Sequence, residues 1–248
     1  MPLLFAQGLR KSFGETRAVD GVDFLVESEE LVSLVGSNGA GKTTLVNLLS
    51  GLLVPDAGSI AFQDADITAV PVRDRIKAGI ARSFQLVNLF DQLSALDNVR
   101  LAIFSRDGTT RQVLRLAERN RHAREEALEI LRDFGLEDKW DTPAAGLAQG
   151  ERKLLDVALA YALRPKLILL DEPTSGVGTR EKGTIMDAVA QLVQARGLAA
   201  VIVEHDMDVV FTYSHRIVMM HQGKVLAEGT PEQIRADERV ATALLGKA

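Results

Sequence analysis

The stretch from Gly36 to Thr43 reads GSNGAGKT and has the residue types needed to hold a phosphate group. It matches the pattern G-x-x-x-x-G-K-[ST], in which glycines let backbone N–H groups turn toward the ligand. A helix that begins directly after the loop would add its positive end. We expect Lys42 to meet the β- and γ-phosphates of a nucleotide, and the Thr43 hydroxyl to face Mg²⁺. The predicted nucleotide-binding residues of this segment are Gly36, Ser37, Asn38, Gly39, Ala40, Gly41, Lys42, Thr43 and Thr44.

Two acids and a histidine follow other apolar runs. "LILLDE" ends with Asp171 and Glu172, and "VIVEHD" carries His205. The carboxyl ends of strands are where open α/β sheets bind ligands. We expect Asp171 to hold Mg²⁺ and Glu172 to polarise a water molecule as a general base. His205 could hydrogen-bond a γ-phosphate, although a lone histidine is more often structural. Gln85, after a short strand, is a candidate ligand of Mg²⁺ or of the water, on a weaker signal.

These side chains need buried strands and tight turns to bring them together. "ELVSLVG", "KLILLD" and "LAAVIVE" are continuous apolar runs, typical of strands buried on both faces. A helix is predicted from about Thr179 to Arg196, with Gly197 as its end. The helix after the phosphate loop is expected to end at Gly51 and to include Leu52 on its apolar face. Alternating strands and helices predict an α/β fold with a parallel sheet.

The middle of the chain has a different sequence pattern. From about residue 86 to 164 the pattern is helical, and "TTRQVLRLAERNRHAREEALEILRDFG" is long, charged and helix-periodic, with Gly135 as its expected end. We interpret this part as a helical subdomain inserted into a core made of residues 1–85 and 165–248. The whole chain, 1–248, would then be a single domain of the size that one large core allows.

Local signals mark both ends of the chain. The first 30 residues alternate between apolar and polar types as strands do. "RIVMMHQGKVLAEG" predicts a hairpin around Gln222 and Gly223. The following helix has a capping box, with Thr230 as the cap, Pro231 in the first turn and Gln233 reaching back.

Composition excludes several classes of function. The chain has no cysteine, which excludes disulfides, thiolate metal sites and thiol catalysis. A formal net charge of −5 argues against a large nucleic-acid interface. No apolar run approaches the ~18 residues that a membrane-spanning helix requires. A GTPase is disfavoured because the sequence has no "NKxD" motif to read guanine.

Taken in order, Phe13, "GSNGAGKTT", Gln85, "LAQGE", "LILLDE" and "EHD" resemble the ATP-binding cassette (ABC) ATPases across essentially the whole chain. The resemblance implies a P-loop NTPase core with a parallel sheet, an N-terminal antiparallel β-subdomain and an inserted α-helical subdomain. It implies that Phe13 stacks on adenine, although a lone aromatic in a strand is usually core. It also implies that the loop at Gln85 senses the transport partner and that His205 is the switch histidine. The signature motif would be Leu147, Ala148, Gln149, Gly150 and Glu151.

Hydrolysis of ATP with Mg²⁺, coupled to transport, is the activity that this resemblance implies. "ARSFQLVNLFDQLSALDNV", "EHDMDVV" and "GTPEQIRADERV" look like importers of branched-chain amino acids and related polar solutes. We expect a peripheral subunit at the cytoplasmic face of the inner membrane, bound to permease subunits and served indirectly by a periplasmic or extracellular solute-binding protein. Residues 86–96 would dock a permease helix or belong to the core. The alternatives are an ATPase of the lipopolysaccharide-export type and, less favoured, a non-transport ABC protein acting on DNA or ribosomes.

Members of this family pair two chains around two ATP molecules, and each signature contacts the γ-phosphate held by the other chain. Ala148 lacks the hydroxyl of the usual serine, but backbone N–H groups and the helix end can still bind phosphate. Gly178 stands where the family usually has aspartate, and Leu159 stands where it usually has arginine. These departures favour a heterodimer with a related ATPase whose signature is fuller, with a homodimer as the alternative.

Overall fold

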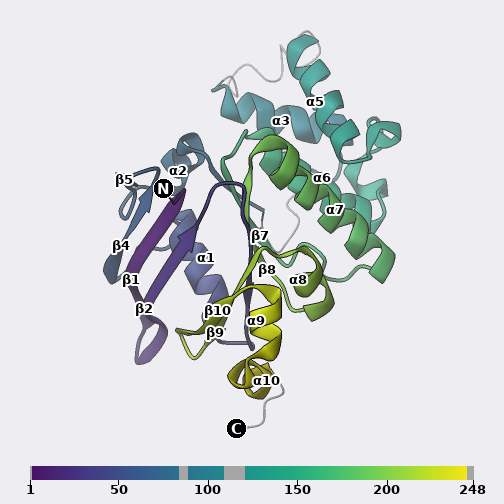
Figure 1. Cartoon of the computed structure of the whole chain (residues 1–248). Coiled ribbons are helices and arrows are strands. Elements are labelled where there is room, and N and C mark those ends of the chain that lie inside the picture. The colour runs from purple at the N-terminus through teal and green to yellow at the C-terminus, as the bar shows by residue number, and fades with distance from the viewer. Residues whose placement is uncertain (1, 84–88, 109–120, 245–248) are drawn as a thin grey trace.

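The computed structural model of the chain describes residues 2–83, 89–108 and 121–244. Its described strands form two sheets, one of six strands and one of four. Figure 1 shows the two sheets on one side and a group of helices at the upper right. This arrangement confirms the predicted α/β fold with an added β-subdomain and an inserted helical subdomain.

The six-stranded sheet brings together the strand ends on which the predicted chemistry depends. Its inner strands pair in parallel, and only the last strand in the chain joins antiparallel to its neighbour. Three of these strands are buried at every residue, which explains their continuous apolar sequences. In spatial order the strands are β10 (Lys224–Gly229), β9 (Arg216–His221), β3 (Leu31–Val35), β8 (Ala199–Val203), β7 (Leu167–Asp171) and β6 (Ile80–Arg82).

The four-stranded antiparallel sheet covers one face of the core. Helix α1 (Lys42–Ser50) packs between the two sheets, in a cluster that joins Leu4, Leu45 and Leu169. The helix ends at Gly51, as predicted, but Leu52 lies beyond it and is exposed, so its assignment to the helix face was wrong. In spatial order the strands of this sheet are β2 (Thr16–Val26), β1 (Leu4–Phe13), β4 (Ala57–Phe62) and β5 (Ala65–Asp66).

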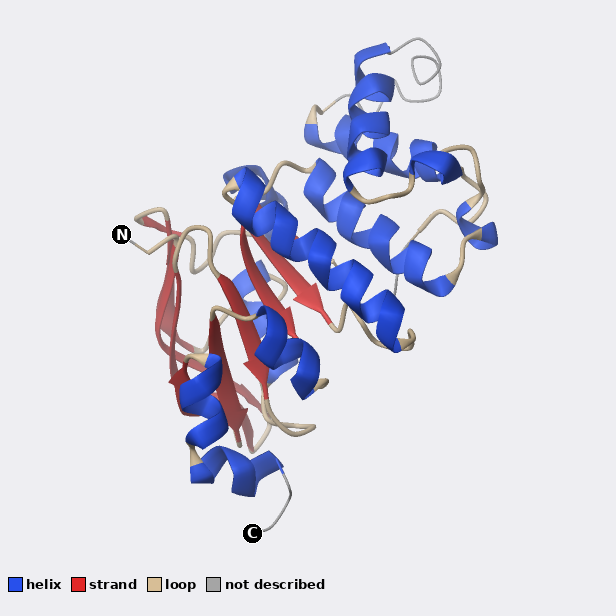
Figure 2. Ribbon diagram, turned by 45° about the vertical axis from the view of Figure 1, so that its right-hand side comes forward, coloured by secondary structure: helices blue, strands red, loops and turns tan. Residues whose placement is uncertain are grey.

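Helices cover the opposite face of the six-stranded sheet, as Figure 2 shows. Helix α7 ends at Gly197, whose φ of 66° is the left-handed conformation that glycine allows, in agreement with the predicted end. The described part of the predicted charged helix is α5, and Gly135 follows it with a φ of 65°. The helices are α2 (Val72–Ala78), α3 (Ala95–Arg106), α5 (Arg121–Asp133), α6 (Gln149–Ala162), α7 (Thr179–Arg196), α8 (Met207–Tyr213), α9 (Pro231–Ala236) and α10 (Glu238–Leu244), with 3₁₀ turns at Glu137–Lys139 and Ala144–Gly146.

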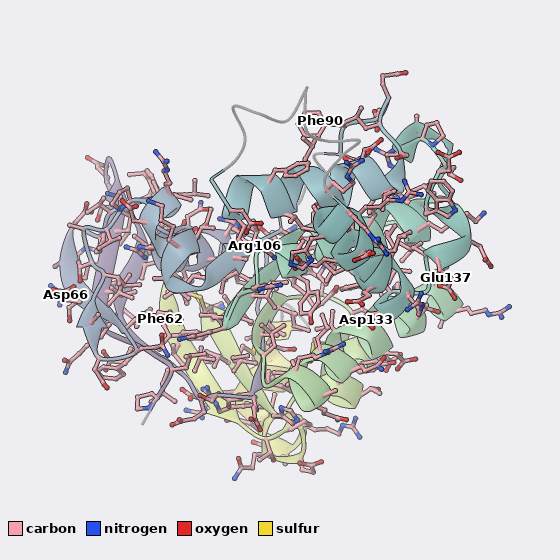
Figure 3. All side chains as sticks on the ribbon, turned by 90° about the horizontal axis from the view of Figure 1, so that it is seen from above. Phe62, Asp66, Phe90, Arg106, Asp133 and Glu137 are labelled. Atoms are coloured by element: carbon pink, nitrogen blue, oxygen red, sulfur yellow. The ribbon has the colours of Figure 1, made fainter. Side chains whose placement is uncertain are left out.

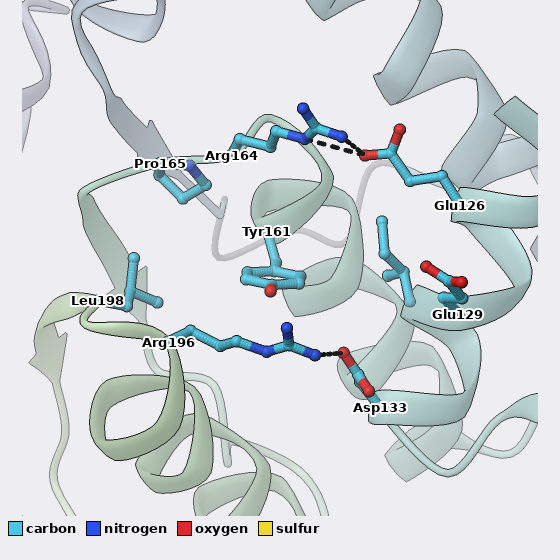
Figure 4. Close-up of a pocket in the computed structure, with 9 residues that line it drawn as sticks. Glu126, Glu129, Asp133, Tyr161, Arg164, Pro165, Arg196 and Leu198 are labelled. Atoms are coloured by element: carbon cyan, nitrogen blue, oxygen red, sulfur yellow. Dashed lines mark hydrogen bonds and ion pairs between the residues drawn. The ribbon is translucent and has the colours of Figure 1, made fainter. Parts of the chain in front are cut away.

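A polar cavity of about 360 Å³ lies where α5 meets the end of α6 and the end of α7. Two ion pairs cross it, as Figure 4 shows: Arg164 lies 3.1 Å from Glu126, and Arg196 lies 2.9 Å from Asp133. Tyr161 stands between them, and burial raises the pKa of its phenol. The pairs connect α5 to the loop that precedes β7 and to α7, and both arginines are more than half exposed.

Candidate active site

The predicted phosphate loop connects the end of β3 to the start of α1. Its backbone is so close to neighbouring strands that side chains do not fit. A Cβ at Gly36 would lie 2.2 Å from the carbonyl oxygen of Met220, and one at Gly41 would lie 2.2 Å from that of Ala18. No side chain caps the amino end of α1, so its N–H groups remain available to an anion. The loop thus has the local structure that the sequence predicted.

Lys42, the first residue of α1, lies over this loop. Its Nζ donates hydrogen bonds to the carbonyl oxygens of Gly36 at 2.7 Å and Ser37 at 3.1 Å. Burial lowers the pKa of Lys42, whereas the negative charges of Glu172 and Asp171 act to raise it. The lysine therefore lies within electrostatic reach of the two acids that end β7.

Asp171, the last residue of β7, is buried and faces the end of β6. Arg82 Nη2 lies 3.1 Å from Asp171 Oδ2, and its other terminal nitrogen contacts Asn47 of α1. Burial lowers the pKa of the Arg82 guanidinium, and the charge of Asp171 opposes that shift. Through Arg82, the carboxylate of Asp171 is connected to α1, the helix that follows the phosphate loop. Sequence reasoning missed Arg82, although a charged residue at the end of the apolar run "GIA" was a signal for it.

Glu172 adopts a left-handed backbone with a φ of 51°, which is uncommon for a residue with a side chain. Its N–H donates to the carbonyl of Val203 at 2.9 Å, which ties this turn to the end of β8. Its Oε1 lies 2.9 Å from Nε2 of His205, in the segment that follows β8. Both side chains are partly exposed, so water can reach them. The structure thus brings together the acid and the histidine that the sequence placed 33 residues apart.

Phe13 lies at the end of β1 and is 51% exposed, so the alternative that it belongs to the core is wrong. The hairpin of β1 and β2 that carries it borders the phosphate loop, because Ala18 of β2 contacts Gly41. Gln85 lies outside the described residues, and its role remains a prediction.

The predicted signature forms the start of α6, with Ala148 as the N-cap and Gln149 as the first helical residue. Alanine has no side-chain acceptor, so only half of a capping box forms: the Ala148 N–H donates to Glu151 Oε2 at 2.8 Å. A Cβ at Gly150 would lie 2.8 Å from Glu181 Oε1 of α7. The first turn of α6 is therefore in close contact with the start of α7.

Gly178 and Leu159, the other two departures from the family pattern, lie in different places. Gly178 is the N-cap of α7, and its N–H donates to Glu181 Oε2 at 3.0 Å, directly beside Gly150. Leu159 lies eleven residues after Ala148 on α6, about 16 Å along the helix axis. It lines a groove with Ser83 and other residues. Gly178 is thus placed to affect the signature directly, whereas Leu159 belongs to a different surface.

Replacing Ala148 with serine is expected to stabilise the fold by about 1 kcal/mol, because the hydroxyl would accept a hydrogen bond from the first turn of α6. For a chain of this size that corresponds to a rise in Tm of roughly 2–4 °C. Thermal unfolding measures it, with Ala145→Ser, an exposed position that caps no helix, as the control. An unchanged or lower Tm in Ala148→Ser would show that this backbone does not accept the cap.

Comparisons with known proteins agree with this geometry. Residues 19–175 match the family described as ABC transporter, and residues 224–248 match the one described as branched-chain amino acid ATP-binding cassette transporter. The high-affinity branched-chain amino acid transport ATP-binding protein BraF of Pseudomonas aeruginosa is 35% identical, over 100% of this chain and 99% of its own. The lipopolysaccharide export system ATP-binding protein LptB of Haemophilus influenzae is 34% identical, over 100% and 98%.

A crystal structure of the ADP conformation of an ATP-binding cassette of an ABC transporter superposes with a TM-score of 0.87 and 29% identity, covering 100% of both chains. Among the described residues, no helix has the length and apolar character needed to cross a membrane. A full-length match in sequence and fold, joined to a phosphate loop beside two acids and a histidine, leads to one conclusion: the chain belongs to the ABC transporter family and is an ATP-binding, ATP-hydrolysing subunit of that family.

Proposed function

We propose that this chain powers an importer of branched-chain amino acids or related polar solutes, from the cytoplasmic face of the inner membrane. The observation that carries the proposal is the match of residues 224–248 to the branched-chain amino acid transporter family, at the end of a chain that resembles BraF throughout. Export of lipopolysaccharide is the second candidate, because LptB is similar over nearly the same length.

The residues present fit ATP and Mg²⁺. The glycine positions that exclude a Cβ form a narrow backbone cradle, and Lys42 supplies a cation beside it. The Thr43 hydroxyl and the Asp171 carboxylate are oxygen donors of the kind that Mg²⁺ prefers, and Gln85 is the predicted third ligand. When bound, Mg²⁺ neutralises the charge of the β- and γ-phosphates. In this proposal the exposed ring of Phe13 faces the adenine.

Glu172 is the proposed general base. Its carboxylate takes a proton from the water that attacks the γ-phosphate. His205, whose Nε2 lies 2.9 Å from Glu172 Oε1, would hold this carboxylate in position and hydrogen-bond the γ-phosphate. Asp171 contacts Arg82 whereas Glu172 contacts His205, so that one acid would serve the metal and the next would serve the water. ATP binding would close a dimer around the two nucleotides, and hydrolysis would reopen it.

An apolar groove of about 410 Å³ between β6, α3 and α6 supports the proposed contact with a permease. Its apolar lining comes from Phe90, Leu101, Ala102, Leu159, Ala160 and Leu163. Phe90 is 59% exposed, and Figure 3 shows it at the outer edge of the helices, whereas Leu96 is buried in the core. Within the described part of the predicted docking segment, Phe90 is therefore available to a partner, whereas Leu96 belongs to the core.

Purification from detergent-solubilised membranes tests this function. We expect the tagged full chain to copurify with short polytopic permeases, and Phe90→Asp to lose them because a charge would enter the apolar groove. Val54→Asp is the matched control, since Val54 is 55% exposed and lies outside the groove. Copurification with a lipopolysaccharide-export complex would favour the second candidate. Ribosomes or DNA in place of permeases would contradict both transport assignments.

The proposed dimer is a heterodimer with a related ATPase, served by a solute-binding protein outside the membrane. Ala148 and Gly178 both lie at the surface that this chain would offer to its partner's γ-phosphate, and neither supplies a side-chain hydrogen bond there. The site built on this chain's own Lys42, Glu172 and His205 would instead be completed by the partner. The same purified complex is expected to contain two different ATPase chains in equal amounts, and a complex with this chain alone would establish the homodimer.

A further inference from the structure

The start of α6 is fastened to the turn that carries Glu172. Lys153, one turn after the first residues of α6, is a buried lysine with 7% relative exposure. Its Nζ donates hydrogen bonds to the carbonyl oxygen of Glu172 at 3.2 Å and to the hydroxyl of Ser175 at 3.1 Å. A buried ammonium group needs such partners, because removing it from water is costly. The contact therefore joins the signature helix to the backbone of the proposed base.

The turn at Glu172 needs this kind of support. A left-handed residue with a side chain is held in place by its surroundings, because the conformation is disfavoured by itself. Three hydrogen bonds hold the backbone of Glu172: its N–H donates to the carbonyl of Val203, and its carbonyl accepts from the Ser175 N–H at 3.1 Å and from Lys153. Lys153 is the charged donor of this set, and charge-assisted hydrogen bonds are the stronger kind.

A second contact connects the same part of α6 to the strand that precedes Gln85. Asp156, three residues after Lys153, forms a hydrogen bond with the side chain of Ser83, next to the end of β6. Desolvation raises the pKa of Asp156 to about 7, and Lys153 and Ser83 oppose that shift. The side chains of α6 thus contact the turn that follows β7, through Lys153, and the residue that follows β6, through Asp156.

We infer that Lys153 is a positioning residue for ATP hydrolysis: it holds the backbone of Glu172 in the conformation that aims the carboxylate, and it ties that carboxylate to the helix that carries the signature. This inference rests on the proposed role of Glu172 as the general base. Any displacement of the first turn of α6 by the partner's nucleotide would then be transmitted to the base of the same chain. Lys153 would not touch the nucleotide, so its loss should affect the rate and leave binding unchanged.

Lys153→Met in the full complex, assayed with ATP and Mg²⁺, tests the inference because methionine keeps the length of the side chain and removes its donors. We expect kcat to fall about 10- to 100-fold, the range for a lost charged hydrogen bond, with the affinity for ATP within about two-fold of the unmodified chain. Lys153→Arg should restore most of the rate. Lys166→Met, an exposed lysine that bonds Gln63, is the control and should have normal kcat.

The double variant separates this inference from the proposed function. If Glu172 is the base, the double variant Lys153→Met, Glu172→Gln should have nearly the same kcat as Glu172→Gln alone. The carboxylate that Lys153 positions is already absent in both. If Glu172→Gln alone keeps near-normal turnover, the proposed function of Glu172 fails. If Glu172→Gln is slow but Lys153→Met keeps its kcat, or loses ATP affinity instead, Lys153 has no positioning role. Should Lys153→Met not fold, Lys153→Gln shortens the side chain and removes its charge, and an unchanged kcat in that variant would overturn the inference.

Discussion

Replacing Glu172 with glutamine is expected to slow ATP hydrolysis by about 10²- to 10⁴-fold while leaving ATP binding intact. Glutamine has the shape of glutamate and can keep a hydrogen bond to His205, but it cannot take a proton from water. Because the product would form so slowly, the variant should accumulate in the ATP-bound dimer. Steady-state hydrolysis, equilibrium binding of labelled ATP and size-exclusion chromatography together measure these effects.

Glu137→Gln provides the control for this experiment, since Glu137 is an exposed acid in the 3₁₀ turn of the helical subdomain. Its hydrolysis rate should match that of the unmodified chain. Near-normal turnover in Glu172→Gln would mean that another residue is the base. Loss of ATP binding in Glu172→Gln would assign this side chain to the nucleotide site itself.

Lys42→Ala is expected to abolish ATP binding. The ammonium group lies over the phosphate loop, and backbone N–H groups alone would have to balance the triphosphate charge. The variant should still fold, because burial lowers the pKa of Lys42. A base whose pKa is lowered holds its charge at a cost to the folded state, and alanine removes that cost.

Equilibrium binding of labelled ATP to purified Lys42→Ala measures this effect, and circular dichroism checks the fold. Lys77→Ala is the matched control, because Lys77 is an exposed helical lysine whose partner is Asp74. Tight binding of ATP by Lys42→Ala would refute the assigned role of the lysine.

Local patterns in the sequence predicted the features that depend on local chemistry. The hairpin turn at Gln222 and Gly223 has positive φ at both residues, as a two-residue hairpin requires. Thr230 caps α9 and Gln233 reaches back to it, as the capping box indicated. The buried strands could be predicted because burial on both faces requires a continuous apolar run. In each case the signal and its cause lie within a few residues of each other.

Contacts between distant segments were not predictable in this way. Arg82 and Asp171 are 89 residues apart, and they meet only because β6 and β7 are neighbours in the sheet. Lys153 and Glu172 meet because α6 packs beside the end of β7, which no periodicity in either segment reveals. A lysine at a buried position of an otherwise apolar helix face was nevertheless a sign that it had a partner. The sequence therefore predicted the residues of the candidate site better than the side chains that support them.

The two ion pairs across the cavity beside Tyr161 make the attachment of α5 sensitive to ionic strength. Exposed charges lose most of their attraction as the Debye length falls from about 10 Å at 0.1 M salt to about 3 Å at 1 M. Arg164 and Arg196 are exposed enough to be screened in this way, whereas Lys42 and the Arg82–Asp171 pair are shielded by burial. Concentrated salt would therefore weaken these two links of α5 before it disturbs the phosphate loop, while the apolar cluster that joins the helical subdomain to β7 and β8 would persist. The ionic composition of the surroundings would then help to set how firmly α5 is held against the rest of the chain.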